Sequence, residues 1–260
     1  MIRVRPIWDG TWKDCSVVKF LQGVERAIKR KLPPGLRRRL RSSKFELIAM
    51  RARPIDLVVH VGAHHAEDRA LYESFGAQAV LWIEADPDTF TTLQSVLDAH
   101  QGPGRHIAHL GLASSTPGAE MEFHRFSGDG ASSSVYRATD RFRQRFSQVE
   151  ETGEVVRLRS QTLPEIMAGH GIDPRAAGKA LLVIDVQGHE LAVLSGLGDA
   201  LRDFAFCKCE ISREPFYEGG ARFSEVDTHF RKLGFALVSH PYRRVPRHGD
   251  VLFSAGGQRR

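Results

Sequence analysis

Cysteine is scarce in this chain of 260 residues, which contains only Cys15, Cys207 and Cys209. The three form no pair with the spacing of zinc ligands, and an odd, sparse set makes a poor disulfide framework. A chain of this length buries a core large enough to fold without disulfides or a structural metal. We therefore expect a reducing, cytoplasmic compartment.

Long apolar runs are missing as well. No stretch reaches the ~18 apolar residues that a membrane-spanning helix needs. The first part of the chain also lacks the apolar run of about 7–15 residues that is typical of a secretory signal. The sequence therefore predicts a globular protein with neither feature.

A basic excess is absent from most of the chain, although the formal net charge is +6. Residues 1–53 hold 15 Lys and Arg against 4 Asp and Glu, whereas the remainder holds 22 against 27. The positive charge therefore belongs to the N-terminal segment. The acidic remainder argues against a catalytic face that grips nucleic acid.

Two domains are expected from this division: a basic helical appendage over residues 1–53 and a catalytic domain over residues 54–260. Within the appendage, apolar residues recur at helical spacing with basic residues between them, at Val17, Phe20, Leu21, Val24 and Ile28. Such helices either pack their apolar stripe on the domain or contact an anionic membrane surface or another acidic partner.

Strand-like and helix-like segments alternate from residue 55 onward. Strands are expected at 55–61, 79–85, 106–113, 120–126, 155–159, 180–186, 204–211, 236–239 and 250–254. Helices are expected at 66–75, 87–99, 162–170, 189–201 and 223–233. The alternation predicts an α/β, Rossmann-like fold. Its sheet is expected to be doubly wound, mostly parallel and seven-stranded, with right-handed crossovers and an antiparallel C-terminal edge.

A full G-x-G-x-x-G motif is absent, which disfavours binding of NAD or FAD. The first predicted strand ends in a single glycine, in Val59-His60-Val61-Gly62-Ala63-His64. A glycine at this point lets the backbone approach a ligand at the carboxyl end of the strand. A purely structural glycine is the alternative.

Two acidic residues lie where the second predicted strand ends, Glu84 among its last residues and Asp86 directly after it. Glu84 stands 22 residues after Gly62, where a carboxylate can accept hydrogen bonds from a ribose of either S-adenosylmethionine or a dinucleotide. Asp86 precedes Pro87, an order typical of a helix N-cap followed by proline at the first helical position. We therefore assign ribose binding to Glu84 and capping to Asp86.

Asp185 interrupts the most apolar predicted strand. A carboxylate is costly to bury without a partner, so we expect Asp185 at the open end of the strand, facing a cleft. A helix cap or a salt bridge is the alternative. Cys207 and Cys209 alternate within another strand and are expected to be packing residues on one face.

The segment IDVQGHELAVLSG, residues 184–196, resembles the signature of FkbM-family methyltransferases. Residues 60–87 resemble that family's first motif and its acidic ribose motif, and CEIS (209–212), GFAL (234–237) and DVLF (250–253) fit its later strands. The resemblance covers roughly residues 56–254. The chain departs from the family pattern at His60, Ala66, Val183 and His189, where Asp, Gly, Lys and Ala are usual.

The resemblance implies a class I methyltransferase that moves the methyl group of S-adenosylmethionine to a hydroxyl oxygen of a sugar, a glycan or another natural product. It implies that Gly62, Ala63 and His64 lie against the methionine part. Glu84, with Ala85 beside it, would hold the ribose. Leu112 and Ala113 would lie near the adenine. Asp185 would face the methyl-transfer zone.

The reaction needs a base for the hydroxyl proton, for which Asp185, His189, Glu210 and His240 are the candidates. Asp185 and Glu210 end two strands that we expect to be neighbours. Together they are able to position the hydroxyl or to hold a divalent cation through oxygen ligands. No metal is expected at the adjacent pair His64-His65. The serine-rich segment 132–134 either borders the site or is a solvated loop.

Three other classes of function compete with this reading. An RNA methyltransferase is supported only by the basic appendage, since the (D/N/S)-P-P-(Y/F) turn of amino-methylating enzymes is absent. A non-catalytic relative that keeps the fold as a binding module is favoured by His60 and Ala66. A nicotinamide-dependent oxidoreductase is disfavoured by the missing glycines. The sequence does not identify the acceptor or the oligomeric state.

Overall fold

The computed structural model describes residues 52, 54–239 and 247–256. Its strands are β1 (Leu57–Val61), β2 (Ala79–Glu84), β3 (Arg105–Leu110), β4 (Leu112–Ala113), β5 (Glu120–Phe126), β6 (Glu151–Gln161), β7 (Ala180–Ile184), β8 (Phe206–Ser212), β9 (Phe235–Leu237) and β10 (His248–Ala255). Its helices are α4 (Arg69–Ser74), α5 (Pro87–Asp98), α6 (Asp140–Arg145), α7 (Leu163–Gly169), α8 (Glu190–Leu197) and α9 (Phe223–Lys232), with a 3₁₀ helix η2 (Gly198–Asp203).

The predicted basic appendage lies outside the described residues apart from Ala52, and so does His240. Its helices and its membrane contact therefore stay predictions.

Seven strands form the large sheet in the order β3-β2-β1-β7-β8-β10-β9. The strands from β3 to β8 run parallel, and β10 pairs antiparallel with both β8 and β9. The chain reverses direction across the sheet between β1 and β7, where a ligand cleft is expected in a doubly wound fold. The predicted α/β fold with an antiparallel C-terminal edge is confirmed.

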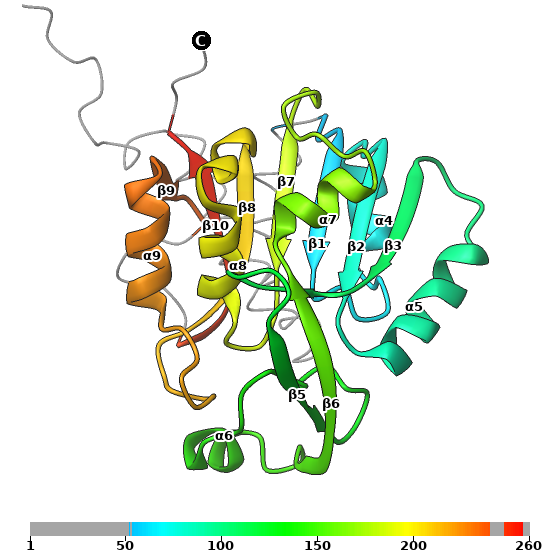
Figure 1. Ribbon diagram of the computed structural model, residues 1–260. Helices are drawn as coiled ribbons and strands as arrows, with labels where there is room; N and C mark the ends of the chain where they lie inside the picture. Colours follow the sequence, from blue (N-terminus) through cyan, green and yellow to red (C-terminus); the bar gives the residue numbers. More distant parts are fainter. Residues whose placement is uncertain (1–51, 53, 240–246, 257–260) are drawn as a thin grey trace, which may run out of the picture. The chain divides into compact units, whose positions relative to one another are not determined.

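Each face of the large sheet carries its own hydrophobic core, because successive side chains of a strand point to opposite faces. Val59, Leu182 and Cys207 pack with residues of α7, α8 and α9 on one face. Val58 and Leu181 pack with residues of α4 and α5 on the other. Figure 1 shows α7, α8 and α9 in front of the sheet. Cys207 and Cys209 are fully buried and on one face, as predicted.

A small sheet of order β4-β6-β5 is attached to the large one. The strand predicted over 106–113 is divided at Gly111, whose N–H donates to the carbonyl of Glu84 at 2.9 Å. The chain then turns so that Leu112 and Ala113 pair with β6 instead of extending β3. As Figure 1 shows, β5, β6 and α6 extend beyond one end of the large sheet. The sequence did not predict α6.

The start of α5 confirms the role assigned to Asp86. Its side chain accepts from the N–H groups of Asp88 and Thr89, and Pro87 occupies the first helical position. Arg125 of β5 holds the same carboxylate through two hydrogen bonds of 2.9 Å. Asp86 therefore caps α5 and also fixes the small sheet to it.

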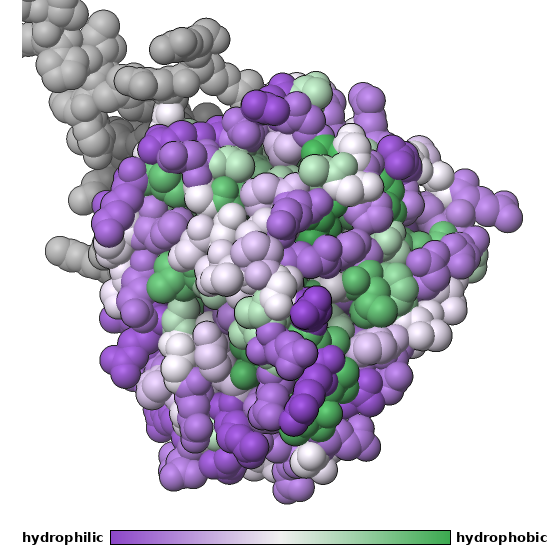
Figure 2. Space-filling model, viewed as in Figure 1, coloured by the Kyte–Doolittle hydropathy of each residue, from purple (hydrophilic) through white to green (hydrophobic). Residues whose placement is uncertain are grey.

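Hydrophilic residues cover most of the face shown in Figure 2, and the hydrophobic residues on it form separate small areas. Within the described part of the chain, none of the helices combines the length and the apolar character needed to cross a membrane.

Candidate active site

A cavity of about 380 Å³ opens at the carboxyl ends of β1, β2 and β7. Ligand pockets usually measure about 300–1,000 Å³. The eight residues predicted to contact a cofactor all line this cavity: Gly62, Ala63, His64, Glu84, Ala85, Leu112, Ala113 and Asp185. His189 lines it as well, whereas Glu210 lines a smaller pocket beside it, of about 20 Å³.

Gly62 makes the floor of the cavity possible. Its φ angle is +80°, in the left-handed region that favours glycine. A Cβ atom at this position would lie 1.8 Å from the carbonyl oxygen of Asp185. The ends of β1 and β7 therefore approach each other as closely as they do only because residue 62 has no side chain.

Glu84 is buried at the end of β2, with 8% of its surface exposed. Its Oε2 atom accepts from the N–H of His64 at 2.9 Å, and its Oε1 atom accepts from the N–H groups of Ala85 and Asp86. Burial raises the pKa of Glu84, while these three backbone donors oppose the rise. A carboxylate has roughly four acceptor positions, so one stays available for a ribose hydroxyl.

Gln187 joins the carboxylates of Asp185 and Glu210, at the tips of β7 and β8. Its side-chain nitrogen donates to Asp185 at 2.7 Å and to Glu210 at 2.8 Å. Its side-chain oxygen accepts from the hydroxyl of Tyr217 at 2.9 Å. Gln187 holds this position with a φ of +53°, which is uncommon outside glycine and costs energy.

The two carboxylates titrate as a pair, because like charges this close cannot both ionise readily. Burial is the largest cause that raises the pKa of Glu210 well above its usual range, and Asp185 and Asp250 add to it. Burial and Asp250 also raise the pKa of Asp185. Both carboxyl groups therefore hold a proton to higher pH than isolated carboxyl groups do.

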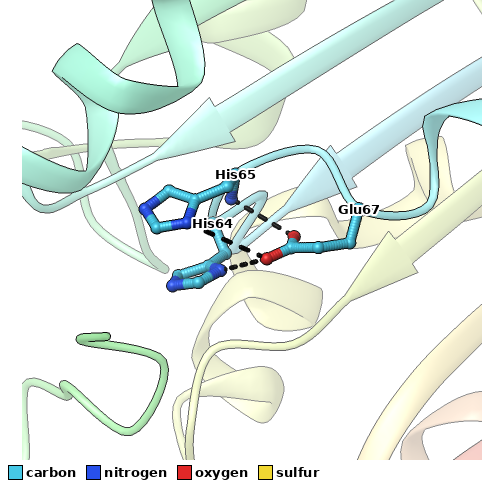
Figure 3. A group of neighbouring side chains, drawn as sticks. All are labelled: His64, His65 and Glu67. Atoms are coloured by element: carbon cyan, nitrogen blue, oxygen red, sulfur yellow. Dashed lines mark hydrogen bonds and ion pairs between the residues drawn. The ribbon is translucent and has the colours of Figure 1, made fainter. Parts of the chain in front are cut away.

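His64 connects the loop after β1 with the segment 127–134. Its Nδ1 lies 2.5 Å from Glu67 and its Nε2 lies 2.9 Å from the carbonyl oxygen of Asp129. The hydrogen bond with Glu67 is the largest cause that raises the pKa of His64 to about 9. Figure 3 shows His64 and His65 stacked beside Glu67. Both ring nitrogens of His64 face acceptors, so both carry protons in this arrangement and neither offers a lone pair to a metal.

His189 bridges the residue that follows β4 and the segment before α6. Its Nε2 lies 3.0 Å from the hydroxyl of Ser114, and its Nδ1 lies 3.2 Å from the hydroxyl of Tyr136. Burial lowers the pKa of His189 to about 4, so the ring is neutral and a weak base at physiological pH.

A family model described as the methyltransferase FkbM domain matches residues 60–237, from β1 to the end of β9. The chain belongs to the FkbM methyltransferase family. The resemblance noted in the sequence is thereby confirmed, and with it S-adenosylmethionine as the family's cofactor. None of the curated proteins compared with the chain matches it.

Solved structures similar to this chain include a protein of the NADB-Rossmann superfamily from Streptococcus agalactiae, at 9% identity. That match covers 82% of this chain and 68% of the other, with a TM-score of 0.42. Magnesium protoporphyrin IX methyltransferase from Synechocystis PCC 6803, with bound S-adenosylmethionine, matches at 9% identity, 84% and 78% coverage, and a TM-score of 0.41. A putative RNA methyltransferase from Pyrococcus horikoshii matches at 12% identity, 84% and 83% coverage, and a TM-score of 0.40. Similarities this low do not bear on the acceptor.

The cavity of this FkbM-family chain has the features that S-adenosylmethionine requires. The missing Cβ at Gly62 lets the ends of β1 and β7 lie against each other at the cavity floor. Glu84 has an acceptor position to spare, on which a ribose hydroxyl would fit, and the buried pair Leu112 and Ala113 lines the cavity with apolar surface, against which a flat base would fit. The residues present therefore fit the cofactor.

Three carboxylates meet beside the cavity, because Asp250 of β10 lies opposite Glu210 of β8. Oxygen atoms of Asp185, Glu210 and Asp250 lie within 4.8 Å of one another. Such oxygens are ligands that divalent cations prefer. The same carboxylates are already contacted by Gln187 and Lys208. A divalent cation at this place stays a prediction.

Sequence reasoning missed several residues of this FkbM-family site. Asp68 and Lys208 line the cavity, and Tyr217 orients Gln187. The signal for Lys208 was present, since a lysine between two cysteines in a buried strand requires an acidic partner. That partner, Asp68, is 140 residues away in the chain and could not be identified from spacing.

Proposed function

We propose that this chain transfers the methyl group of S-adenosylmethionine to a hydroxyl oxygen of a sugar, a glycan or another natural product. The observation that carries the proposal is that Asp185, at the wall of the cavity, is paired with the carboxylate of Glu210 through Gln187. S-adenosylmethionine supplies an electrophilic methyl group on a sulfonium centre. The protein must then align the acceptor oxygen and accept its proton.

The cofactor contacts proposed from the sequence follow the sheet from β2 to β7. Leu112 and Ala113 contact the adenine, and Glu84, with Ala85 beside it, holds the ribose. The backbone at Gly62, Ala63 and His64 faces the methionine part. These residues line one continuous cavity, which supports the assignment.

Asp185 is the proposed base. Its raised pKa brings this carboxylate nearer to the working pH, which makes it a better proton acceptor than an ordinary aspartate. Gln187 orients both carboxylates through its side-chain nitrogen. His189 was another of the candidates, but its pKa of about 4 and its two hydroxyl partners favour a positioning role.

The test is transfer of radiolabelled methyl from S-adenosylmethionine to a panel of saccharides and hydroxylated natural products. A methyl ether withstands mild alkali, whereas a methyl ester releases its label. The proposal predicts an alkali-stable product. Label that is found only in ribonuclease-sensitive material would instead identify an RNA methyltransferase. Binding of the cofactor without transfer to any acceptor would support a non-catalytic relative.

The matched variant is Asp185→Asn, which keeps the shape of the side chain and removes its charge. Removing a general base typically lowers kcat by about 10²–10⁴-fold. We expect that loss, with the Kd for S-adenosylhomocysteine changed much less. Asp173→Asn, at an exposed aspartate away from the cavity, serves as the control. A wild-type rate in Asp185→Asn would exclude Asp185 as the base.

A further inference from the structure

The proposed cofactor contacts leave one end of the cavity unassigned. Across the sheet order β2-β1-β7-β8, the cavity passes Glu84, Gly62 and Asp185 and ends at Lys208. A ligand whose ribose lies at Glu84 therefore extends its other end toward β8. In S-adenosylmethionine that end is an amino acid, with an α-ammonium group and an α-carboxylate.

Lys208 places a positive charge at this end. Its Nζ lies 3.3 Å from Asp68 Oδ2 and 3.1 Å from Asp250 Oδ2. Its side chain is 15% exposed. Burial alone would lower the pKa of Lys208, but Asp250 and Asp68 outweigh it and raise the pKa, so the group stays charged. Among the described residues that line the cavity, Lys208 is the only lysine or arginine.

Asp68 places a negative charge beside it. Asp68 stands at the N-cap position of α4, yet its side chain makes no capping hydrogen bond. The carboxylate instead turns to Lys208 and to the buried hydroxyl of Tyr72, and both contacts use Oδ2. Within the described part of the chain, no side chain donates to Oδ1. An N-cap aspartate that leaves its helix uncapped is unusual and calls for another role.

His60 completes the surroundings without adding charge. Its Nδ1 lies 3.0 Å from the Tyr72 hydroxyl, and burial is the largest cause that lowers its pKa to about 4. The ring is neutral, so the charges beside it are those of the Asp68 carboxylate and the Lys208 ammonium. A zwitterion is the ligand that such a pair complements.

We propose that Asp68 and Lys208 bind the amino-acid end of the cofactor, Asp68 through the α-ammonium group and Lys208 through the α-carboxylate. This inference rests on the proposed function. A purely structural bridge from α4 to β8 and β10 is the competing explanation. The two differ in one respect: a bridge affects every ligand equally, whereas a binding pair affects only ligands that carry the amino acid.

Three ligands distinguish the contributions of the ammonium group and the carboxylate to binding. Calorimetry measures the Kd of each ligand. S-adenosylhomocysteine has both charged groups, its decarboxylated amine has only the ammonium, and 5′-methylthioadenosine has neither. A hydrogen bond to a charged group is worth about 10- to 100-fold in affinity. We expect the wild-type protein to bind S-adenosylhomocysteine more tightly than 5′-methylthioadenosine by at least that factor.

Lys208→Met should raise the Kd for S-adenosylhomocysteine by about 10-fold or more. The Kd values for the amine and for 5′-methylthioadenosine should stay within about threefold of the wild-type values. Asp68→Asn should weaken the binding of both ligands that carry the ammonium group and leave the binding of 5′-methylthioadenosine unchanged. Lys232→Met, at an exposed lysine of α9, is the matched control and should bind as the wild type does. Since Lys208→Met leaves two carboxylates without their cation, Asp68→Asn decides the matter if that variant does not fold.

Equal weakening of all three ligands in both variants would overturn the proposal and establish a structural bridge. Unchanged affinity for S-adenosylhomocysteine would overturn it as well. If the wild-type protein binds none of the three ligands, the cofactor assignment itself fails. If the wild type binds all three equally, the cofactor assignment stands and only the role of Asp68 and Lys208 is excluded.

Discussion

A side chain at residue 62 would collide with the backbone of Asp185. The Cβ atom of an alanine at this position would lie 1.8 Å from the Asp185 carbonyl oxygen, a distance that real Cβ atoms do not reach. The neighbouring strands β1 and β7 are hydrogen-bonded there, with Asp185 N–H donating to the Val61 carbonyl at 2.9 Å. The backbone of β7 therefore cannot move aside without breaking the sheet at the cavity floor.

Gly62→Ala should consequently lower stability and cofactor affinity together. Gly118→Ala is the matched control, because Gly118 has a φ of +74° but nothing within 4 Å of its Cβ position. A positive φ costs an alanine about 1–2 kcal/mol, so the control should lose that much. Gly62→Ala should lose about 3 kcal/mol or more. Urea unfolding measures both, and equal losses would show that the contact with Asp185 is unimportant.

Gln187→Leu should destabilise the protein through the loss of two hydrogen bonds to buried carboxylates. We expect about 2 kcal/mol, since leucine keeps the size of the side chain but leaves Asp185 and Glu210 without that donor. Gln94→Leu is the control, because Gln94 makes the same kind of bond to Asp98, but on the exposed surface of α5. That change should cost no more than about 0.5 kcal/mol. Similar losses in both variants would contradict a special role for Gln187.

Much of this site could be predicted from the sequence because parallel strands bring their carboxyl ends to one edge. Gly62, Glu84 and Asp185 each end an apolar run, and position in the run was enough to place them together. The clear apolar runs were equally informative about β2 and β7. The sequence was less informative about β6, which is mostly exposed and therefore has no apolar run, and about α6, which is a single short helix.

Contacts made by side chains between distant segments could not be predicted. The approach of Lys208 to Asp68, and of Gln187 to Glu210, depends on the strand order and on rotamers, neither of which spacing reveals. His189 was predicted as a possible base because its ordinary pKa suits that task. Its burial between Ser114 and Tyr136 lowers the pKa, and burial of one residue at the start of a helix is not visible in the sequence.

The ion pair of His64 with Glu67 should make stability fall as the pH rises. The folded-state pKa of His64 is about 9 against 6.5 in the unfolded chain. Its contribution is therefore complete below pH 6.5 and is lost as the pH rises through about 9. For Glu67, burial alone would raise the pKa, but the hydrogen bond with His64 outweighs it and lowers the pKa to about 2.

A double-mutant cycle of His64→Gln and Glu67→Gln checks this assignment, with unfolding measured at pH 6 and pH 10. The wild type should be less stable at pH 10 than at pH 6. In each single variant, most of this difference in stability should be absent. The double variant should add little to either single one, because the pair acts as one unit. Additive effects would show that the two residues stabilise the loop separately.

Glu190→Gln should stabilise the protein at alkaline pH. Glu190 is buried, and burial raises its pKa to about 7 in spite of hydrogen bonds from the N–H groups of Gly188 and Val186. A raised folded-state pKa gives stability that is complete below pH 4.5 and is lost as the pH rises through about 7. A glutamine keeps one oxygen for both donors and has no charge to bury.

The variant and the wild type should therefore be equally stable near pH 4.5. At pH 8.5 the variant should be more stable by about 1–3 kcal/mol. Thermal unfolding across this range measures the difference. If the variant is less stable at every pH, the folded protein stabilises the charged form of Glu190, which would contradict the prediction.

Whether the cavity is an S-adenosylmethionine site is tested most directly by calorimetric titration with S-adenosylmethionine, S-adenosylhomocysteine and NAD. The titration is repeated on Glu84→Ala after its folding has been checked by circular dichroism. We expect micromolar binding of both adenosyl ligands, much weaker binding in the variant, and no binding of NAD. If the well-folded wild-type protein binds neither adenosyl ligand, the cavity is not an S-adenosylmethionine site, and the chain is a relative that keeps the fold without the chemistry.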